Sequence, residues 1–567
     1  MRSFDAVVVG AGPAGMSAAI GLRAHGLSVL VVDEQPAPGG QIWRAVEAVA
    51  PTTTGALLGE EYLAGAELAS RFRSCGASYE PETRVWQVES EWKVYMTRRG
   101  QAELVETGHV ILAMGAQERP APFPGWTLPG VMTVGSAQIL LKTSRQIPSE
   151  PVWVVGSGPL PLLYMAQLIR AGGKIAGWLD TSPAGGWRRA LPWIGAAMAS
   201  SKDLLKGLAW MRELQAAGVK RVRGVTAVRA LGQDRLQEIE YIQANGKTMR
   251  VPASLLLSHE GVVPSIHMTQ ALGCDHEWSS QQACLAPVLD EWGQTDKPGI
   301  YVAGDGAGIG GAYAACVRGE LVALGVAKRA GRLSSEAASV QAAPLREKLK
   351  KLLRLRPMLD ALYPPRANIA TPTDDTVVCR CEELTAGDIR KAAAIGQPGP
   401  NQLKAYTRAG MGPCQGRQCG YTIAHILAQE QGRTVADVGF YRIRPPLKPV
   451  TLAELATLNI DEQEAKEMQK KMLSNEFTLE DFLSQMQQIK KMGPLKDLMG
   501  MIPGMNKFNL DEALNGVDPS KEMAKTEAII QSMTREERLN PSILNGPRKK
   551  RIANGSGRSI AEVNRLL

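Results

Sequence analysis

One turn near the start of the chain limits its fold more than any other feature. The segment "DAVVVGAGPAGMSAAIGLRAHG" places Gly10, Gly12 and Gly15 between a β-branched run and an alanine-rich stretch. The first glycine permits a tight turn, the second lets a diphosphate approach the backbone, and the third lets helix and strand pack closely. The free N–H groups of the helix N-terminus then meet the phosphates. The next apolar run ends in Asp33 and Glu34, which are placed to accept ribose hydroxyls. We therefore predict a dinucleotide-binding strand, turn and helix.

A second segment of the same kind follows later in the chain. "VWVVGSGPLPLLYMAQLIRAGG" has Gly156 and Gly158 in place, but its third position is Pro161. Proline is tolerated in a first helical turn, although its ring obstructs the close packing that glycine allows. Asp180 ends the next predicted strand at a plausible ribose distance. Two interpretations stay open: an NAD(P) site, or a domain that keeps this fold and binds no NAD(P).

The bulk of the sequence fits a doubly wound α/β protein with added domains. Residues 1 to about 330 alternate β-branched runs, glycine turns and helical stretches, the pattern of that class. At 567 residues the chain is too long for one core. The formal net charge of +9 predicts some attraction to acidic partners. No apolar run approaches the roughly 20 residues of a membrane helix, and no targeting signal is evident. We expect a cytoplasmic protein, with peripheral attachment to a membrane through a partner as the alternative.

The cysteines are unevenly spread, and four of the eight form one cluster. Cys379 and Cys381 stand in C-x-C spacing, and Cys414 and Cys419 follow in "GMGPCQGRQCG". In a cytosolic chain, clustered cysteines favour ligation of a metal or cluster over disulfides. Four thiolates are the complement of one [2Fe–2S] cluster. Structural zinc is the alternative, although its cysteines more often stand in C-x-x-C knuckles.

Two later stretches resemble the second and third FAD signatures of the two-dinucleotide-domain flavoprotein reductases. These stretches are "HVILAMGAQERP", with Gly115, and "GIYVAGDGAGIGGAYAACVRGELVA", with Gly304 and Asp305. The resemblance implies that Asp305 bonds the ribityl chain of the flavin and that the following helix points its N-terminus at the flavin. "GGQIWR", with Gly40 and Gln41, resembles the loop that lies along the isoalloxazine. We therefore predict FAD, bound non-covalently, at the first site.

The cysteine module resembles the bacterioferritin-associated-ferredoxin type of [2Fe–2S] domain. In residues 1–457 of this chain, flavin domains are followed by this module. This order is similar to that of the large subunits of opine oxidase, hydrogen cyanide synthase and hydroxyproline or proline dehydrogenase. The resemblance implies an amine or amino-acid dehydrogenase of opine, glycine or hydroxyproline type. In such complexes a second flavoprotein subunit oxidises the C–N bond, this subunit relays electrons, and a small ferredoxin-like subunit can join them. The sequence indicates no catalytic residue in this chain, and His259 is expected to pack between domains.

The last fifth of the chain changes character. From about residue 460 aromatic residues nearly vanish, and nine of the 21 methionines occur there. This stretch resembles the M domain of the signal recognition particle (SRP) protein, without the GTPase domain that normally precedes it. The resemblance implies binding of SRP-type RNA and of apolar signal peptides. Four basic residues and a glycine-serine turn would bind RNA: Arg548, Lys549, Lys550, Arg551, Gly555, Ser556 and Gly557. Flexible methionines would line the signal-peptide groove: Met492, Met499, Met501 and Met505.

The predicted organisation has six segments. They are the first part of the FAD-binding domain (1–112), a second NAD-type dinucleotide-binding domain (113–270), the last part of the FAD-binding domain (271–330), a helical linker (331–370), the [2Fe–2S] module (371–457) and an all-α SRP M-like domain (460–567). The leading hypothesis is an FAD- and [2Fe–2S]-dependent oxidoreductase subunit with an appended RNA-binding domain. The alternatives are an SRP-type RNA and signal-sequence binder with an incidental flavoprotein, and an NAD(P)H-dependent flavin reductase.

Overall fold

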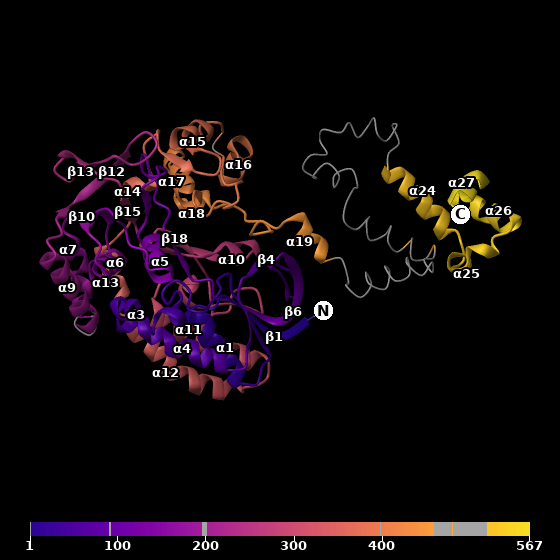
Figure 1. Cartoon of the computed structure of the whole chain (residues 1–567), viewed down its shortest axis with the longest axis horizontal. Coiled ribbons are helices and arrows are strands. Elements are labelled where there is room, and N and C mark those ends of the chain that lie inside the picture. The colour runs from indigo at the N-terminus through magenta and orange to yellow at the C-terminus, as the bar shows by residue number, and fades with distance from the viewer. Residues whose placement is uncertain are drawn as a thin grey trace. The chain divides into compact units, whose positions relative to one another are not determined.

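The computed structural model describes residues 2–89, 92–195, 201–396, 398–458, 479, 483 and 519–566. The chain divides into two compact units, Met1–Thr451 and Leu452–Leu567 (Figure 1). Within the described ranges, no helix has the length and apolar character that crossing a membrane requires. The predicted groove residues lie outside these ranges: Met492, Met499, Met501 and Met505.

The first unit opens on a seven-stranded sheet in the order β3-β2-β1-β6-β5-β4, with β19 also paired to β6. Strands β1, β2, β3, β6 and β19 are parallel, whereas β4, β5 and β6 form an antiparallel meander. Residues 6–9 of the first strand are buried and all apolar, as expected for a parallel strand covered on both faces. The strands are β1 (Arg2–Val9), β2 (Val29–Val32), β3 (Ser78–Glu80), β4 (Thr83–Glu89), β5 (Lys93–Arg98), β6 (Gln101–Leu112) and β19 (Ile300–Val302).

Helices from both ends of this α/β region pack side by side (Figure 1). A side chain at Gly319 would overlap the Ala14 carbonyl oxygen, and a Cβ at Gly21 would lie 2.7 Å from the Ala323 Cβ. The late helix that carries Gly319 can therefore pack against the first helix only because small residues stand where the two helices cross. The helices are α1 (Pro13–Ala24), α2 (Val46–Val49), α3 (Thr53–Leu58), α4 (Glu60–Ser74), η3 (Gly304–Ala307), α11 (Ala312–Arg329) and α12 (Ser335–Leu353).

A second, five-stranded parallel sheet has the order β11-β10-β9-β15-β8, and a three-stranded antiparallel sheet, β12-β13-β14, adjoins it in sequence. Both glycine-rich segments thus begin parallel sheets, as the strand-turn-helix patterns predict. The strands are β8 (Val131–Thr133), β9 (Val152–Gly156), β10 (Ile175–Asp180), β11 (Arg221–Arg223), β12 (Val225–Leu231), β13 (Glu238–Gln243), β14 (Thr248–Pro252) and β15 (Leu256–His259). The helices are α5 (Val134–Ser144), α6 (Pro159–Arg170), α7 (Gly186–Ala190), η2 (Leu191–Trp193) and α9 (Ser201–Ala216).

Short strand pairs connect these sheets to the cysteine module. They are β7 (Ala116–Glu118) with β16 (Val262–Pro264), and β17 (His276–Ser279) with β18 (Cys284–Pro287), with α10 (His267–Ala271) between them. Helices α13 (Arg356–Leu362) and α14 (Ala367–Ala370) lead into the module. The apolar residues of the module belong to the same buried cluster as those of the first sheet. A capping box between Thr385 and Asp388 starts the first helix of the module. Its elements are β20 (Val377–Cys379), β21 (Leu384–Thr385), α15 (Ala386–Ala393), α16 (Pro400–Thr407), α17 (Gly420–Glu430) and α18 (Val435–Val438).

The second unit is helical throughout its described residues. Ile529, Met533, Ile552 and Val563 form its core, and Leu483 packs against Ile530. Its elements are α19 (Leu452–Thr457), α24 (Pro519–Gln531), α25 (Arg535–Leu539), η5 (Pro541–Ile543), α26 (Gly546–Ser556) and α27 (Ile560–Leu566).

The glycine-serine turn predicted in this unit is shorter than expected. Helix α26 continues through Gly555 and Ser556, and only Gly557, with φ of +64°, stands beyond its end in the left-handed region. The Ser556 hydroxyl donates to the Ile552 carbonyl, 2.8 Å away and one turn earlier in the same helix.

Candidate functional site

The three glycines of the first turn serve different purposes. Gly10 has φ of +107°, and a Cβ there would lie 2.5 Å from the Ala113 carbonyl oxygen. A Cβ at Gly15 would overlap the Gly10 carbonyl oxygen. Gly12 has an ordinary φ of −77°, and a Cβ there would meet only the Gly40 Cα, at 3.6 Å. The fold therefore needs the first and third glycines, whereas the absence of a side chain at Gly12 leaves room for a ligand.

The acids after β2 lie beside this turn. The Asp33 carboxylate accepts from the Ala11 N–H at 2.5 Å and from the Gln35 N–H at 2.7 Å. Burial raises the pKa of Asp33 despite these two bonds. Glu34 is exposed and pairs at 2.8 Å with Lys448, which follows α18 in the cysteine module. Asp33 thus stands at the carboxyl edge of the sheet, the position from which such an acid meets a ribose.

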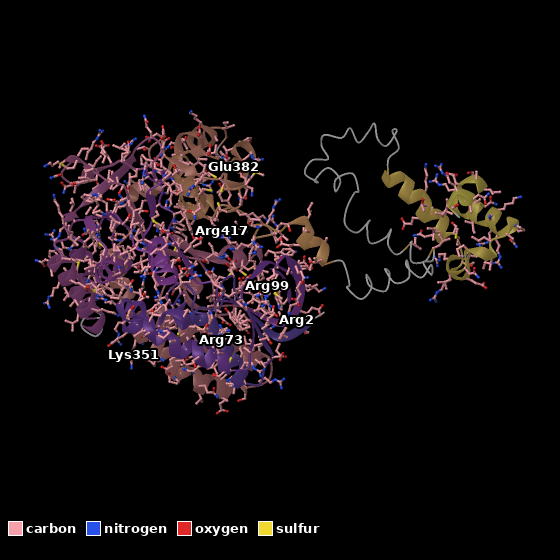
Figure 2. All side chains as sticks on the ribbon, viewed as in Figure 1. Arg2, Arg73, Arg99, Lys351, Glu382 and Arg417 are labelled. Atoms are coloured by element: carbon pink, nitrogen blue, oxygen red, sulfur yellow. The ribbon has the colours of Figure 1, made fainter. Side chains whose placement is uncertain are left out.

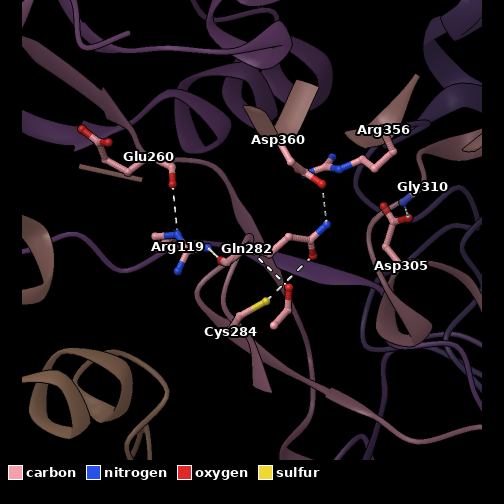
Figure 3. Close-up of polar contacts among 9 residues, drawn as sticks. Arg119, Glu260, Gln282, Cys284, Asp305, Gly310, Arg356 and Asp360 are labelled. Carbon is pink, nitrogen blue, oxygen red and sulfur yellow. Dashed lines mark hydrogen bonds and ion pairs between the residues drawn. The ribbon is translucent and has the colours of Figure 1, made fainter. Parts of the chain in front are cut away.

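The third predicted FAD signature adjoins the first. Asp305 accepts from the Gly310 N–H at 2.9 Å and from the Gly311 N–H at 3.0 Å (Figure 3). A Cβ at Gly304 would lie 2.8 Å from the Ala14 Cβ, so the two signatures lie against each other. The Arg318 guanidinium donates to the Gly304 carbonyl at 3.0 Å, and burial lowers its pKa. This bond fixes the loop that carries Asp305.

The remaining predicted flavin residues lie on two neighbouring loops. Gly40, with φ of +61°, presses on the first turn, because a Cβ there would lie 2.9 Å from the Gly12 Cα. The Gln41 side-chain oxygen accepts from the Arg44 guanidinium at 2.9 Å. Gly115, with φ of +64°, has no atom near its missing Cβ. Open space at Gly12 and at Gly115 is what a dinucleotide passing across these loops requires, so the residues present fit FAD.

The second glycine turn is closed by the chain itself. Gly158 is open, but the Asp180 carboxylate is buried and bonds both to the Arg221 guanidinium, at 2.6 Å, and to the Ser182 N–H, at 2.9 Å. Burial and then the nearby Asp180 charge raise the pKa of Tyr363, which follows α13. Unlike Asp33, whose partners are backbone N–H groups, Asp180 is neutralised by a guanidinium, which makes it a poorer acceptor for a ribose hydroxyl. The residues here therefore favour the interpretation of a domain that binds no NAD(P).

Side chains of the linker form ion pairs and hydrogen bonds with segments that precede it in the sequence. Arg366 and Glu260 form a buried ion pair with atoms 2.5 Å apart. Asp360 accepts from the Gln282 amide at 3.1 Å and from Arg356 at 2.5 Å (Figure 3). This role was not predicted from the sequence, because its sole local signal is the i,i+4 spacing of Arg356 and Asp360.

Two other buried side chains, those of Arg119 and His259, connect segments that are far apart in the sequence. Arg119 donates to the carbonyls of Glu260, Gln282 and Ala283 (Figure 3), and burial lowers its pKa. His259 was expected to pack between domains; it is buried, and its Nδ1 lies 2.7 Å from Glu118. Both residues therefore have structural partners within the chain.

The four clustered cysteines fall into two pairs. Cys379 and Cys419 are buried and hydrogen-bonded to each other; this bond lowers the pKa of Cys379 to about 6 and raises that of Cys419. The other pair is Cys381 and Cys414, on loops that also carry Glu382 and Arg417 (Figure 2). Among the described residues, no group of three or more histidine, cysteine or acidic side chains is placed to hold one metal ion.

The basic residues of the second unit lie along α26 and differ in their contacts. Arg551 bonds the buried Glu537 carboxylate and the Ser532 carbonyl. Arg548 lies 3.6 Å from the same carboxylate. Lys550 is exposed on the same helix. The helix therefore presents positive charge, part of which is held in place by Glu537.

Comparison with known proteins divides the chain in three. Residues 4–319 match the pyridine nucleotide-disulphide oxidoreductase family, residues 373–458 the sarcosine oxidase A3 domain, and residues 458–567 the signal peptide binding domain. The A subunit of opine oxidase from Rhizobium meliloti is 42% identical over 80% of this chain and 88% of its own length. The HcnB subunit of hydrogen cyanide synthase from Pseudomonas protegens is 33% identical over 79% and 96%.

Two further relatives define the fold and the last domain. The crystal structure of L-proline dehydrogenase from P. horikoshii covers 80% of this chain and 79% of its own, with a TM-score of 0.58 and 22% identity. The signal recognition particle protein of Bacillus subtilis is 47% identical over 21% of this chain, but only 26% of that protein is covered. The resemblances to the opine oxidase and hydrogen cyanide synthase subunits and to the signal recognition particle protein are thereby confirmed. The cysteine module matches the sarcosine oxidase A3 domain instead, and its [2Fe–2S] type stays a prediction. Through residues 4–319 the chain belongs to the pyridine nucleotide-disulphide oxidoreductase family, and over four fifths of its length to the family of the opine oxidase A subunit.

Proposed function

We propose that this chain is the FAD- and [2Fe–2S]-containing subunit of a dehydrogenase that oxidises amines or amino acids, with an appended domain that binds SRP-type RNA. One observation carries the redox part: the first and third FAD signatures meet, through Gly304 against Ala14, beside the open space at Gly12. Bound FAD would exchange one or two electrons there. The Gly12 backbone would face the diphosphate, Asp33 the ribose, and Asp305 the ribityl chain. The substrate class follows from the names of the relatives, opine oxidase and L-proline dehydrogenase.

The arrangement of the cysteines favours a two-iron cluster over zinc. The cysteines of a structural zinc site more often stand in C-x-x-C knuckles, whereas Cys379 and Cys381 stand in C-x-C spacing. A [2Fe–2S] cluster instead takes two cysteines at each iron. The pairs Cys379–Cys419 and Cys381–Cys414 match that division. A cluster on these thiolates would accept electrons singly.

The chain is proposed to relay electrons that another subunit supplies. The charged groups near the predicted FAD site, Arg318 on α11 and Asp305, are bonded to backbone groups of the 304–311 segment. No arrangement of nucleophile, base and orienting group emerged among the described residues. The relatives are themselves named as subunits. A catalytic flavoprotein partner would therefore oxidise the C–N bond, and a small ferredoxin-like subunit is a further candidate partner.

The alternative of an NAD(P)H-dependent flavin reductase is disfavoured by the second turn. Pro161 is buried in the first turn of α6, where glycine would allow closer packing. Arg221 is paired with Asp180, the acid that would hold the ribose in an NAD(P) site.

An absorption spectrum with cofactor extraction tests the redox proposal. Purified chain should show flavin bands together with a broad cluster absorption, and should release FAD on denaturation. Reduction should bleach both. Stoichiometric zinc without iron would contradict the cluster, and fast oxidation of NADH or of opines by the chain alone would contradict the relay role.

A second function is proposed for the last domain on a separate observation. It is 47% identical to a signal recognition particle protein and presents basic residues along α26. Counterion release by such residues would drive binding to RNA. Binding of apolar signal peptides is proposed for the methionine-rich segment that lies outside the described residues.

A further inference from the structure

A buried lysine reaches from one dinucleotide-binding domain into the other. Lys142 lies on α5, beside the second sheet, and is only 3% exposed. Its Nζ donates to the Gln41 carbonyl at 3.2 Å and to the Ile42 carbonyl at 2.9 Å, both on the loop after β2. Its third bond, at 3.0 Å, goes to the Gln138 side-chain oxygen one turn earlier on α5. Three acceptors therefore match the three N–H groups of an ammonium.

This ion is buried in unusual surroundings. Among the described residues Lys142 has no carboxylate partner, because all three of its acceptors are neutral oxygens. The Arg44 guanidinium, on the same loop, repels it. The Tyr62 ring centre lies 6.0 Å from Nζ, within range of a weak cation–π attraction. Burial, together with Arg44, lowers the pKa of Lys142 to about 7.

Stability alone does not explain such a group. An apolar side chain of the same length would fill the space without the cost of dehydrating a charge. What the ammonium adds is direction, because it fixes two consecutive carbonyls of one loop relative to a helix of another domain. The rest of the loop is tied as well: the Tyr62 hydroxyl donates to the Arg44 carbonyl at 2.7 Å, and the Gly39 N–H to the Ala11 carbonyl at 2.8 Å.

We propose that Lys142 is a positioning residue, which holds the Gly39–Arg44 loop in the shape that the flavin ring requires and couples that loop to the second dinucleotide-binding domain. This rests on the proposed function in one respect, namely that Gly40 and Gln41 lie along the flavin. A neutral amine offers only two N–H groups, so loss of the proton removes one of the three bonds. The loop should therefore loosen as pH rises through about 7. Arg44 and Tyr62 are the ionisable groups facing Nζ from the loop and from α4, and both keep their protonation in this range.

The test compares Lys142→Met, which keeps an unbranched side chain one atom shorter but removes the charge, with the same change at Lys174, an exposed lysine before β10. Hydrogen exchange of the amides of residues 40–44 is measured in the full chain at pH 6 and pH 8. In Lys142→Met, which loses both bonds to the loop, we expect exchange more than about tenfold faster than in the wild type at pH 6, since about tenfold corresponds to the loss of one hydrogen bond to a charged group. The wild type, which loses one bond on deprotonation, should move part of the way toward the variant at pH 8 after correction for intrinsic exchange. Lys174→Met should behave as the wild type.

The flavin provides an independent readout. Lys142→Met should bind FAD more weakly at pH 6, and its visible spectrum should lose any change between pH 6 and pH 8 that the wild type shows. If wild type and Lys174→Met hold no flavin, the proposed function fails, while hydrogen exchange still tests the loop. Unchanged exchange in a folded Lys142→Met chain would overturn the positioning role. If that variant does not fold, Gln138→Leu, which removes one acceptor, must speed exchange of the same amides, and equal exchange would refute the inference.

Discussion

At the scale of single residues, one glycine of the first turn has a different role from the other two. Gly10 and Gly15 are required by backbone contacts, whereas the space beside Gly12 contains only the Gly40 Cα at ordinary contact distance. Gly12→Ala should therefore fold normally but purify with much less FAD, because its methyl group would stand where the diphosphate must approach. Flavin content and melting temperature are the measurements. Gly15→Ala is the matched control and should lose stability as well. Full flavin content in Gly12→Ala would refute the site.

A histidine gives a second prediction at this scale. Burial, and next the charge of Arg417, lower the pKa of His267 from 6.5 to about 4. The unfolded chain therefore binds this proton more tightly, and stability contributed by neutral His267 is lost as pH falls from about 6.5 to 4. The loss is at most about 1.4 kcal/mol per pH unit. Denaturant unfolding of wild type and His267→Gln should show a shallower acid dependence in the variant. Parallel pH profiles would contradict it.

At the scale of elements, the pairing of β10 with β11 limits what the second dinucleotide-binding domain can do. The Arg221 guanidinium from β11 pairs with Asp180, the acid at the end of β10. We predict no binding of NADH or NADPH, measured by titration of nicotinamide fluorescence, at concentrations up to about 1 mM, the upper end of usual enzyme affinities. Pro161→Gly alone should not restore binding, because the acid stays paired. Saturable NADH binding by the wild type would reopen the reductase alternative.

The cysteine module gives the second prediction for an element. Cys414→Ser should abolish the visible cluster absorption and the EPR signal of the reduced protein, because serine is a poor replacement for a thiolate ligand. FAD content should remain, since Cys414 lies on a loop of the module. Cys316→Ser, at a cysteine of intermediate exposure on α11, is the control and should keep the cluster. Cluster absorption that persists in Cys414→Ser would exclude that residue as a ligand.

At the scale of the whole molecule, the division into two units predicts two separable activities. The full chain should bind an SRP-type RNA hairpin more tightly than a scrambled duplex of equal length, with affinity that falls steeply as salt rises. Lys550→Gln should reduce that salt slope by about one phosphate contact without loss of stability. Arg551→Gln should do both, because Arg551 also bonds the buried Glu537. Equal affinity for the two RNAs would reduce the domain to a generic basic surface. Flavin content should not depend on RNA.

The sequence alone determined the features that are written in short stretches of chain. Glycine spacing, an acid at a strand end and four cysteines in fixed spacing each act through the local backbone, so they indicate the α/β class and the candidate cofactors without a structure. The resemblance of the last domain to an M domain was also visible in the sequence alone, since its helices and basic turn are local features as well. Its exact turn was missed, because α26 continues through Gly555 and Ser556 and ends only at Gly557.

Only the tertiary structure decided how distant residues use one another. Lys142 meets a loop 100 residues earlier, Asp180 is taken by Arg221, and Arg366 is paired with Glu260. None of these pairs has a sequence signal, because each depends on how sheets, loops and linker pack, and packing brings together groups whose separation along the chain is arbitrary. The same reason left the second glycine turn open to two interpretations: its local pattern fits a nucleotide site, and the charge that pairs with its acid comes from another strand.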